Sequence, residues 1–416
     1  MSTRRARMLM VAILTLGGLI TACASADTPQ PVEVEVTRIV AGTPETLVVT
    51  AEPEALEQIK IGFFSPLTGF AAQDGRDALD AALLAVELIN EQGGVNGRPL
   101  QLIHFDDATA PDQAAAVVRK LVEQYGVVAV VSGSYSGPTR AAAPVLQELG
   151  VPMVAAYAVH PDITRTGEYI WRVGAMADVQ GAAGAEVAVS ELGAQKIAML
   201  VTDIDFGISL ATAFKTRAEQ LGAEIVFETR YPLSETDFRP VISQIEASGA
   251  DLVYTTGYPA DGALFVRQAS EEELAIQILG TEGIDSPIQF LAQAGDVAEG
   301  VVITTDLNRD SEREAVQAFL ENFRERYGRD AGMVPASAYD AVQMVAEAIR
   351  LGKPTPEGVL EGLNLIENFE GAVTGPFMRI TPGREVVRPI GAQIVRDGEF
   401  HFFAEIQNEE VIVPPQ

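Results

Sequence analysis

The sequence predicts an α/β protein with two lobes, each built on a doubly wound parallel sheet. From Ile59 onward, short apolar runs alternate with segments of helical spacing. The apolar runs are nearly continuous, which is typical of strands buried on both faces of a parallel sheet. These strand–helix units are too many for one sheet of ordinary width, so two lobes are expected.

Short connections, many of them marked by Gly, Pro or Ser, separate the predicted elements. IKIGFFS, closed by Ser-Pro, reads as a strand, and the alanine-rich helical segment after it stops at GGVNGRP. A tail rich in Gly and Pro turns, 375–403, predicts a small antiparallel piece. The other predicted strands are 100–107, 126–133, 151–158, 196–203, 224–233, 251–259, 276–283 and 300–307; the predicted helices are 77–90, 111–125, 137–150, 209–222, 238–249, 260–272, 286–295, 313–328 and 337–352.

Composition excludes several classes of function. The 416 residues carry a formal net charge of −29, and no basic block follows the first seven residues, so a nucleic-acid partner is not expected. The single cysteine and the scattered histidines His104, His160 and His401 give no metal-site spacing. No phosphate loop and no dinucleotide fingerprint is present, so we expect no cofactor.

The N-terminus reads as an export signal. Three arginines precede the apolar run from Met8 to Ile20, which is short for a membrane span, so residues 1–22 are predicted to be a signal peptide. The run ends in Leu-Ile-Thr-Ala-Cys, which resembles the lipobox of bacterial lipoproteins. The resemblance implies cleavage before Cys23, acylation of that cysteine and attachment to the membrane.

Residues 23–57 are predicted to carry the lipidated cysteine and a flexible tether, because they are rich in Pro, Thr and Glu. Within them VEVEV has the alternation of a strand. No neighbouring segment stands out as its partner.

The stretch Gly133-Ser134-Tyr135-Ser136-Gly137 raises the question of catalysis. A nucleophile elbow needs the serine midway between the glycines, and here the midpoint is Tyr135. Ser136 instead precedes Gly-Pro-Thr at a predicted helix start, where a hydroxyl and free backbone N–H groups suit a carboxylate. A plain helix-capping serine is the alternative. No acid–base partner for a hydrolase is apparent, and we do not expect an enzyme.

Ligands of open parallel sheets lie beyond the carboxyl ends of the strands. The candidate loops are SPLTGFAAQDG, SGSYSGPT, AAYAVHPDIT, TDIDFG, GYPADG and GTEGIDSP.

Together these segments resemble the type 1 periplasmic binding proteins, in the Leu/Ile/Val-binding branch of amino-acid ABC transporter receptors. IGFFSPLTGFAAQDG, ALLAVELINEQGGVNGRPLQLIHFDD, AVVSGSYSGPTRAAAPVLQELGVPMVAAYA, DLVYTTGYPADGALFVRQA and SAYDAVQMVAEAI carry the likeness. It implies two lobes joined by a three-segment hinge. The implied first lobe is 58–176 plus 306–373, and the second is 177–305 plus 374–416.

The resemblance also implies ligand-binding residues. Ser136 takes the place of the serine that binds the ligand carboxylate, with Tyr135 beside it, and Glu282 that of the acid that meets the ammonium. Tyr157 lies where backbone groups touch the ligand. Val159 replaces a threonine and lacks its hydroxyl.

Three further candidates come from the same comparison. Tyr258 and Phe206 take aromatic positions of the second lobe, and Phe206 lacks the usual hydroxyl. Asp74 stands where many members have an aromatic ring. The alternatives are rim packing for Tyr258, core packing for Phe206, a solvated loop acid for Asp74 and a surface loop acid for Glu282. Asp74 with Glu282 suggests a ligand of more positive character or an amide rich in donors.

The implied function is capture of an amino acid, with branched-chain types first, and its delivery to an ABC permease. A ligand-sensing lipoprotein of a signalling system, and a receptor for short amides or urea, are the alternatives.

Overall fold

The computed structural model describes residues 32–40, 43–51, 57–369, 372–375 and 379–415. The predicted signal peptide and Cys23 lie outside the described residues. The chain divides into two compact units, Met1–Ala55 and Leu56–Gln416. In the first unit, β1 (Val32–Val40) pairs antiparallel with β2 (Thr43–Ala51). VEVEV therefore has a strand partner, which the sequence did not single out.

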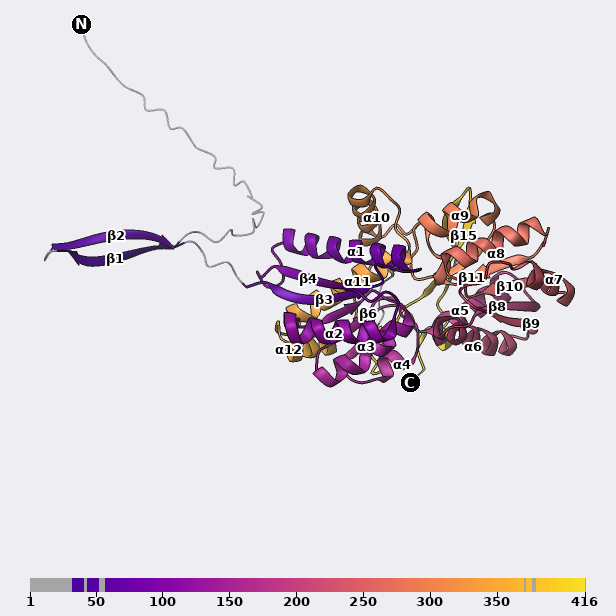
Figure 1. Cartoon of the computed structure of the whole chain (residues 1–416), viewed down its shortest axis with the longest axis horizontal. Helices are drawn as coiled ribbons and strands as arrows, with labels where there is room; N and C mark the ends of the chain where they lie inside the picture. Colours follow the sequence, from indigo (N-terminus) through magenta and orange to yellow (C-terminus); the bar gives the residue numbers. More distant parts are fainter. Residues whose placement is uncertain (1–31, 41–42, 52–56, 370–371, 376–378, 416) are drawn as a thin grey trace, which may run out of the picture. The chain divides into compact units, whose positions relative to one another are not determined.

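The first lobe of the second unit is built on a parallel sheet in the order β4-β3-β5-β6-β7. Figure 1 labels β3, β4 and β6 of this sheet. The chain enters at β3, adds β4 on one side and continues from β5 on the other. This reversal between β3 and β5 creates a topological switch point, where the loops after those two strands diverge. The strands are β3 (Ile59–Ser65), β4 (Leu100–Asp106), β5 (Val130–Ser132), β6 (Met153–Ala155) and β7 (Ile170–Arg172).

The second lobe repeats that strand order. Its sheet runs β16-β15-β12-β11-β10-β8-β9, so the reversal falls between β8 and β10. The tail forms antiparallel strands as predicted, and β15 extends this sheet by pairing with β12. The strands are β8 (Lys196–Thr202), β9 (Glu224–Tyr231), β10 (Leu252–Thr255), β11 (Gln277–Gly280), β12 (Val302–Thr305), β15 (Ile390–Arg396) and β16 (Glu399–Ile406), with the separate pair β13 (Arg379–Ile380) and β14 (Val386–Val387).

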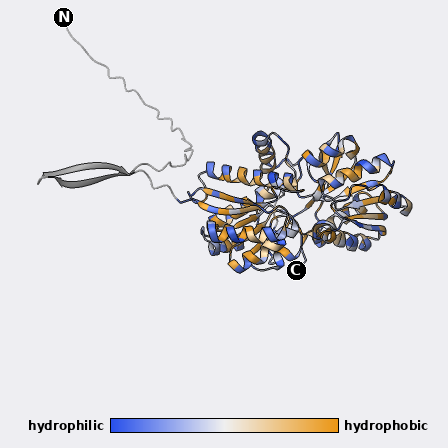
Figure 2. Cartoon of the chain, in the orientation of Figure 1, coloured by the Kyte–Doolittle hydropathy of each residue, from blue (hydrophilic) through white to orange (hydrophobic). Residues whose placement is uncertain are grey.

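Helices cover both faces of each sheet, as the continuous apolar strands require. Figure 2 shows mostly hydrophobic strands, and helices that mix hydrophobic and hydrophilic residues. The first-lobe helices are α1 (Ala72–Glu91), α2 (Pro111–Tyr125), α3 (Ser136–Leu149), α4 (Asp162–Arg165), α10 (Glu314–Tyr327), α11 (Met333–Leu351) and α12 (Pro356–Leu365). Those of the second lobe are α5 (Ala177–Glu186), η1 (Val187–Glu191), α6 (Asp205–Gln220), α7 (Arg239–Ser248), α8 (Pro259–Glu271), η2 (Glu282–Ile284), η3 (Pro287–Leu291), α9 (Ala292–Ala294), η4 (Gly295–Ala298) and α13 (Glu409–Ile412).

The alternation of residues along each strand places one core on each side of its sheet. In β3, Phe63 packs on the side of α1 and α11, whereas Phe64 packs on the side of α2 and α3. In β8, Met199 and Leu200 divide in the same way between two further cores. The two lobes predicted from the sequence are therefore confirmed as separate sheet-centred bodies.

The chain passes between the lobes after β7, after β12 and before β15. Asp306, buried in the second passage, accepts hydrogen bonds from Ala175 N (3.2 Å) in the first and from Gln180 Nε2 (2.9 Å). It also forms an ion pair with Arg388 in the third passage. One carboxylate therefore joins all three passages. Val386, which the predicted boundaries place in the second lobe, packs in the first lobe's α1–α11 core.

Candidate functional site

A pocket lies where the switch points of the two lobes face each other. The β3–α1 loop leads to Asp74, and the β5–α3 loop leads to Tyr135 and to Ser136 at the start of α3. From the second lobe, the loops after β8 and β10 bring Phe206 and Tyr258. The pocket is lined by Asp74, Asp77, Tyr135, Ser136, Tyr157, Phe206, Tyr258, Pro259, Glu282, Gly283, Asp285, Ser286, Gly332, Met333, Val334 and Pro335.

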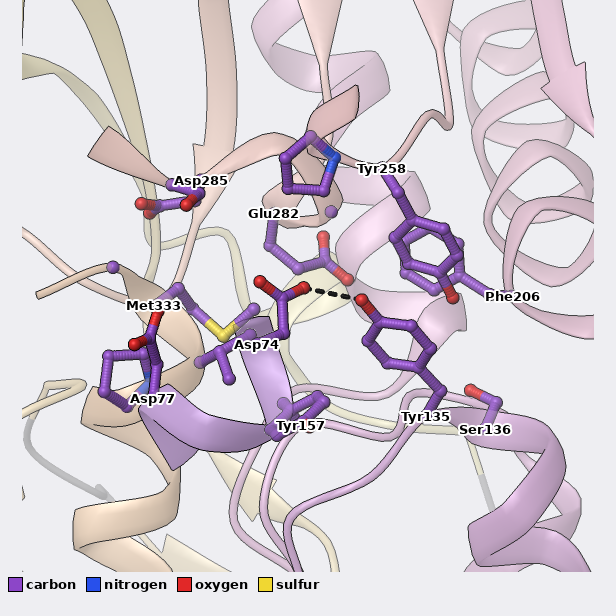
Figure 3. A pocket seen from close by; sticks show the side chains of 16 residues that line it. Asp74, Asp77, Tyr135, Ser136, Tyr157, Phe206, Tyr258, Glu282, Asp285 and Met333 are labelled. Carbon is purple, nitrogen blue, oxygen red and sulfur yellow. Dashed lines mark hydrogen bonds between the residues drawn. The ribbon is translucent and has the colours of Figure 1, made fainter. Parts of the chain in front are cut away.

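Aromatic rings from both lobes form one wall of the pocket (Figure 3). Tyr258 stacks on Tyr135 with the ring centroids 4.5 Å apart and the planes 7° from parallel. Phe206 also stacks on Tyr258, with the ring centroids 4.9 Å apart. Phe206 and Tyr258 thus line the site, in addition to packing against the first lobe's core. Gly283 lets the Phe206 ring and the Gly257 backbone approach, because a Cβ at position 283 would meet Phe206 at 2.9 Å and the Gly257 carbonyl oxygen at 2.6 Å.

Ser136 is the first residue of α3, and Tyr135 is the residue that caps the helix. The Ser136 Oγ is buried, and it has no hydrogen-bond partner among the described residues. The helix-capping alternative for this hydroxyl is therefore not what the structure contains. The Tyr157 side chain lies in the same wall and donates its hydroxyl to the Gly133 carbonyl at 2.5 Å.

Glu282 begins η2 directly after β11, and its side chain is only 3% exposed. Neither carboxylate oxygen has a hydrogen-bond partner among the described residues. Burial raises the pKa of Glu282 to about 8, and the nearby Asp306 and Asp285 contribute to the rise. It is a buried pocket acid and not the surface loop acid of the alternative interpretation.

Asp74 lies in the first turn of α1 and is 7% exposed, so it is not a solvated loop acid. Tyr135 donates its hydroxyl to Asp74 Oδ2 at 2.5 Å, and Gln289 of the second lobe donates to Oδ1. Burial raises the pKa of Asp74 to about 6. The hydrogen bonds from Tyr135 and Gln289 act against this rise, and Asp77 adds to it.

Two other lining acids have cationic partners. Asp77 lies 2.7 Å from the Arg329 Nη2, and Asp285 forms an ion pair with Arg309. Asp77 follows Asp74 by three residues on α1, so helical spacing could have identified it. Asp285 lies in the candidate loop GTEGIDSP but was not singled out within it, and Met333 comes from a helix far along the chain.

Val159 differs from its predicted place. The structure brings seven of the eight candidate residues together, and Val159 is not among the lining residues. Its side chain is buried in the first lobe's core, and its carbonyl accepts a hydrogen bond from Ala177 N at 2.9 Å. The hydroxyl that Val159 lacks, compared with the family threonine, is therefore absent from a packed core beside the hinge and not from the lining of the pocket.

The described residues contain no group of three or more His, Cys, Asp or Glu side chains arranged to hold a metal ion. No helix in the described part of the chain has both the length and the apolar character that crossing a bilayer requires.

The strand order, the inter-lobe pocket and its loops define a class of two-lobed ligand-binding proteins. Residues 58–399 match the periplasmic binding protein family, and the chain belongs to the type 1 members of that family, in the branched-chain amino acid group. The family is one of substrate-binding proteins.

Individual relatives agree. The chain is 33% identical over 312 residues to the leucine-, isoleucine-, valine-, threonine- and alanine-binding protein of Pseudomonas aeruginosa, covering 74% of this chain and 83% of that one. Its fold is similar to that of the branched-chain amino acid transporter substrate-binding protein LivJ from Streptococcus pneumoniae in complex with isoleucine, with a TM-score of 0.78, 26% identity and coverage of 84% and 99%. A solute-binding protein of an ABC transporter from Rhodopseudomonas palustris BisB5, in complex with 3,4-dihydroxybenzoic acid, has a TM-score of 0.76, 25% identity and coverage of 84% and 97%.

Proposed function

We propose that this protein is an extracytoplasmic solute-binding lipoprotein of an ABC transporter that captures an amino acid between its lobes. The observation that carries the proposal is Glu282. A buried carboxylate without a partner is costly, and a ligand ammonium group supplies the counter-charge and the hydrogen-bond donors that it lacks.

The opposite end of an amino acid is matched by Ser136. Its Oγ lies in the pocket without a partner among the described residues, at the start of the 14-residue helix α3. A hydroxyl donor at a helix N-terminus favours a carboxylate, because the first backbone N–H groups and the helix dipole attract negative charge. Ser136 and Glu282 come from different lobes, so a bound amino acid would bridge them.

Closure depends on contacts between the lobes. Tyr258 stacks on Tyr135, and Gln289 donates to Asp74. At the rim, Arg140 of α3 forms a 2.6 Å ion pair with Asp205 of α6. A ligand that contacts both lobes adds its binding free energy to this arrangement and shifts the population toward the closed form.

The closed, loaded form would then dock on a permease in the membrane. The curated relatives are amino-acid-binding proteins, and the similar structure from Rhodopseudomonas palustris BisB5 is a solute-binding protein of an ABC transporter. Acylated Cys23 would hold the protein at the membrane surface, since two or three acyl chains anchor a protein stably.

Calorimetric titration of the purified protein with the common amino acids tests this proposal. Because relatives bind branched-chain amino acids, L-leucine is the reference ligand, with two analogues as controls: 4-methylpentanoate lacks the ammonium group, and 3-methylbutylamine lacks the carboxylate. We expect at least one amino acid to bind, and to lose about 10- to 100-fold in affinity when either group is removed. Absence of binding by every amino acid would refute the proposal.

A further inference from the structure

The charges that line the pocket do not balance. Four carboxylates line it, from Asp74, Asp77, Glu282 and Asp285, and no Lys, Arg or His is among the lining residues. Arg329 pairs with Asp77, and Arg309 pairs with Asp285. Asp74 and Glu282 are therefore left without a cationic partner among the described residues.

Asp74 has hydrogen bonds but no counter-charge. Its two partners, the Tyr135 hydroxyl and the Gln289 amide, are neutral donors, and each carboxylate oxygen can accept a further bond. A carboxylate that is 7% exposed favours a nearby cation, because burial strengthens the attraction and penalises an uncompensated charge. Figure 3 shows this carboxylate directed into the pocket beside the Tyr135 hydroxyl.

Asp74 and Glu282 line the pocket from opposite lobes. Asp74 lies on α1 of the first lobe, beside Asp77, whereas Glu282 lies on η2 of the second lobe, near Asp306 and Asp285. The Tyr258 hydroxyl is within electrostatic reach of both carboxylates. The Tyr135, Tyr258 and Phe206 rings add faces that attract cations.

We propose that the pocket is selective for an amino acid whose side chain carries a second cationic group, with that group bound at Asp74. The inference rests on the proposed capture of an amino acid, whose carboxylate binds at Ser136 and whose α-ammonium binds at Glu282. The two unpartnered, buried groups Ser136 Oγ and Glu282 are independent signs of a ligand here. An aliphatic side chain would leave Asp74 uncompensated.

A matched pair of ligands tests the inference on the full chain. L-Ornithine and L-norvaline have the same carbon skeleton and differ in the terminal ammonium group. Titration at pH 7.5, above the pKa of about 6 of Asp74, keeps that carboxylate ionised. We expect L-ornithine or its homologue L-lysine to bind about 10- to 100-fold more tightly than the matched L-norvaline or L-norleucine.

The Asp74→Asn variant keeps the shape and an acceptor oxygen but removes the charge, and it should lose this preference. Equal or tighter binding of L-norvaline by the unmodified protein would overturn the inference and leave the amino-acid receptor standing. A preference that persists in Asp74→Asn would overturn the role of Asp74. Binding of no amino acid would overturn the proposed function as well. The comparison of ligands on the unmodified protein needs no variant to fold.

Discussion

Replacing Glu282 with Gln is expected to weaken ligand binding while it stabilises the ligand-free protein. The carboxylate is buried, has no hydrogen-bond partner among the described residues, and has a pKa of about 8 in place of 4.5. The unfolded chain therefore releases this proton at lower pH than the folded protein does. The contribution of the Glu282 carboxyl group to the free energy of unfolding is therefore fully present below pH 4.5, and it is lost as the pH rises through about 8.

The loss of folding stability caused by ionisation of buried Glu282 follows from the shift of its pKa. A rise from 4.5 to about 8 corresponds to a loss of the order of 4–5 kcal/mol above pH 8. Gln does not ionise but still buries a polar group, so we expect Glu282→Gln to regain about 2–4 kcal/mol at pH 8.5 and little at pH 4.5. For ligand, loss of a charge-assisted bond should lower the affinity about 10- to 100-fold.

The assay combines urea unfolding at the two pH values with titration of the amino acid that binds most tightly. In the unmodified protein, affinity should also rise between pH 6 and 8, because the ligand ammonium favours the ionised carboxylate. Glu246→Gln, an exposed position on α7, is the matched control and should change neither quantity. A Glu282→Gln variant that is less stable at pH 8.5 and binds as before would refute the reasoning.

Two further substitutions separate the pocket from the hinge. Ser136→Ala removes a hydroxyl that has no partner among the described residues, so the affinity for the amino acid should fall about 10- to 100-fold while the thermal midpoint of unfolding stays nearly unchanged. A lower midpoint with unchanged affinity would show that Ser136 has a structural role. Asp306→Ala breaks the buried ion pair with Arg388, which should lower the free energy of unfolding in urea by about 3–5 kcal/mol. Asp296→Ala, at an exposed position, is the control, and a loss of stability in Asp306→Ala no larger than in this control would contradict the hinge role of Asp306.

The sequence predicted the lobes and the loops of the site for a simple physical reason. Parallel strands buried on both faces need continuous apolar runs, so their ends, and the loops that follow, are visible without a structure. Ser136, Tyr258 and Glu282 could therefore be predicted, because they lie at or just after the ends of predicted strands and because the family resemblance assigns a role to each.

The rest depended on tertiary packing. The hydrogen bond from Tyr135 to Asp74 joins residues 61 positions apart, and Met333 reaches the pocket from α11. The placement of Val159 in a core beside the hinge followed from the backbone course after β6, which its apolar character alone did not reveal. The partner of VEVEV could have been predicted, because only Ala41-Gly42 separates its strand, Val32–Val40, from the strand Thr43–Ala51 in the sequence, and a two-residue connection that contains glycine is a hairpin signal.

The repeated strand order has a practical consequence for protein engineering. Asp74, Ser136 and Glu282 follow strand ends and are not members of the hydrophobic cores, whereas Tyr258 also packs against the first lobe's core. The side chains of Asp74, Ser136 and Glu282 can therefore be exchanged to change the specificity of the pocket while the scaffold is retained. Because Arg140 and Asp205 meet at the rim from opposite lobes, a dye pair attached near them would report ligand capture by fluorescence. The chain is thus a natural starting point for a family of small-molecule biosensors.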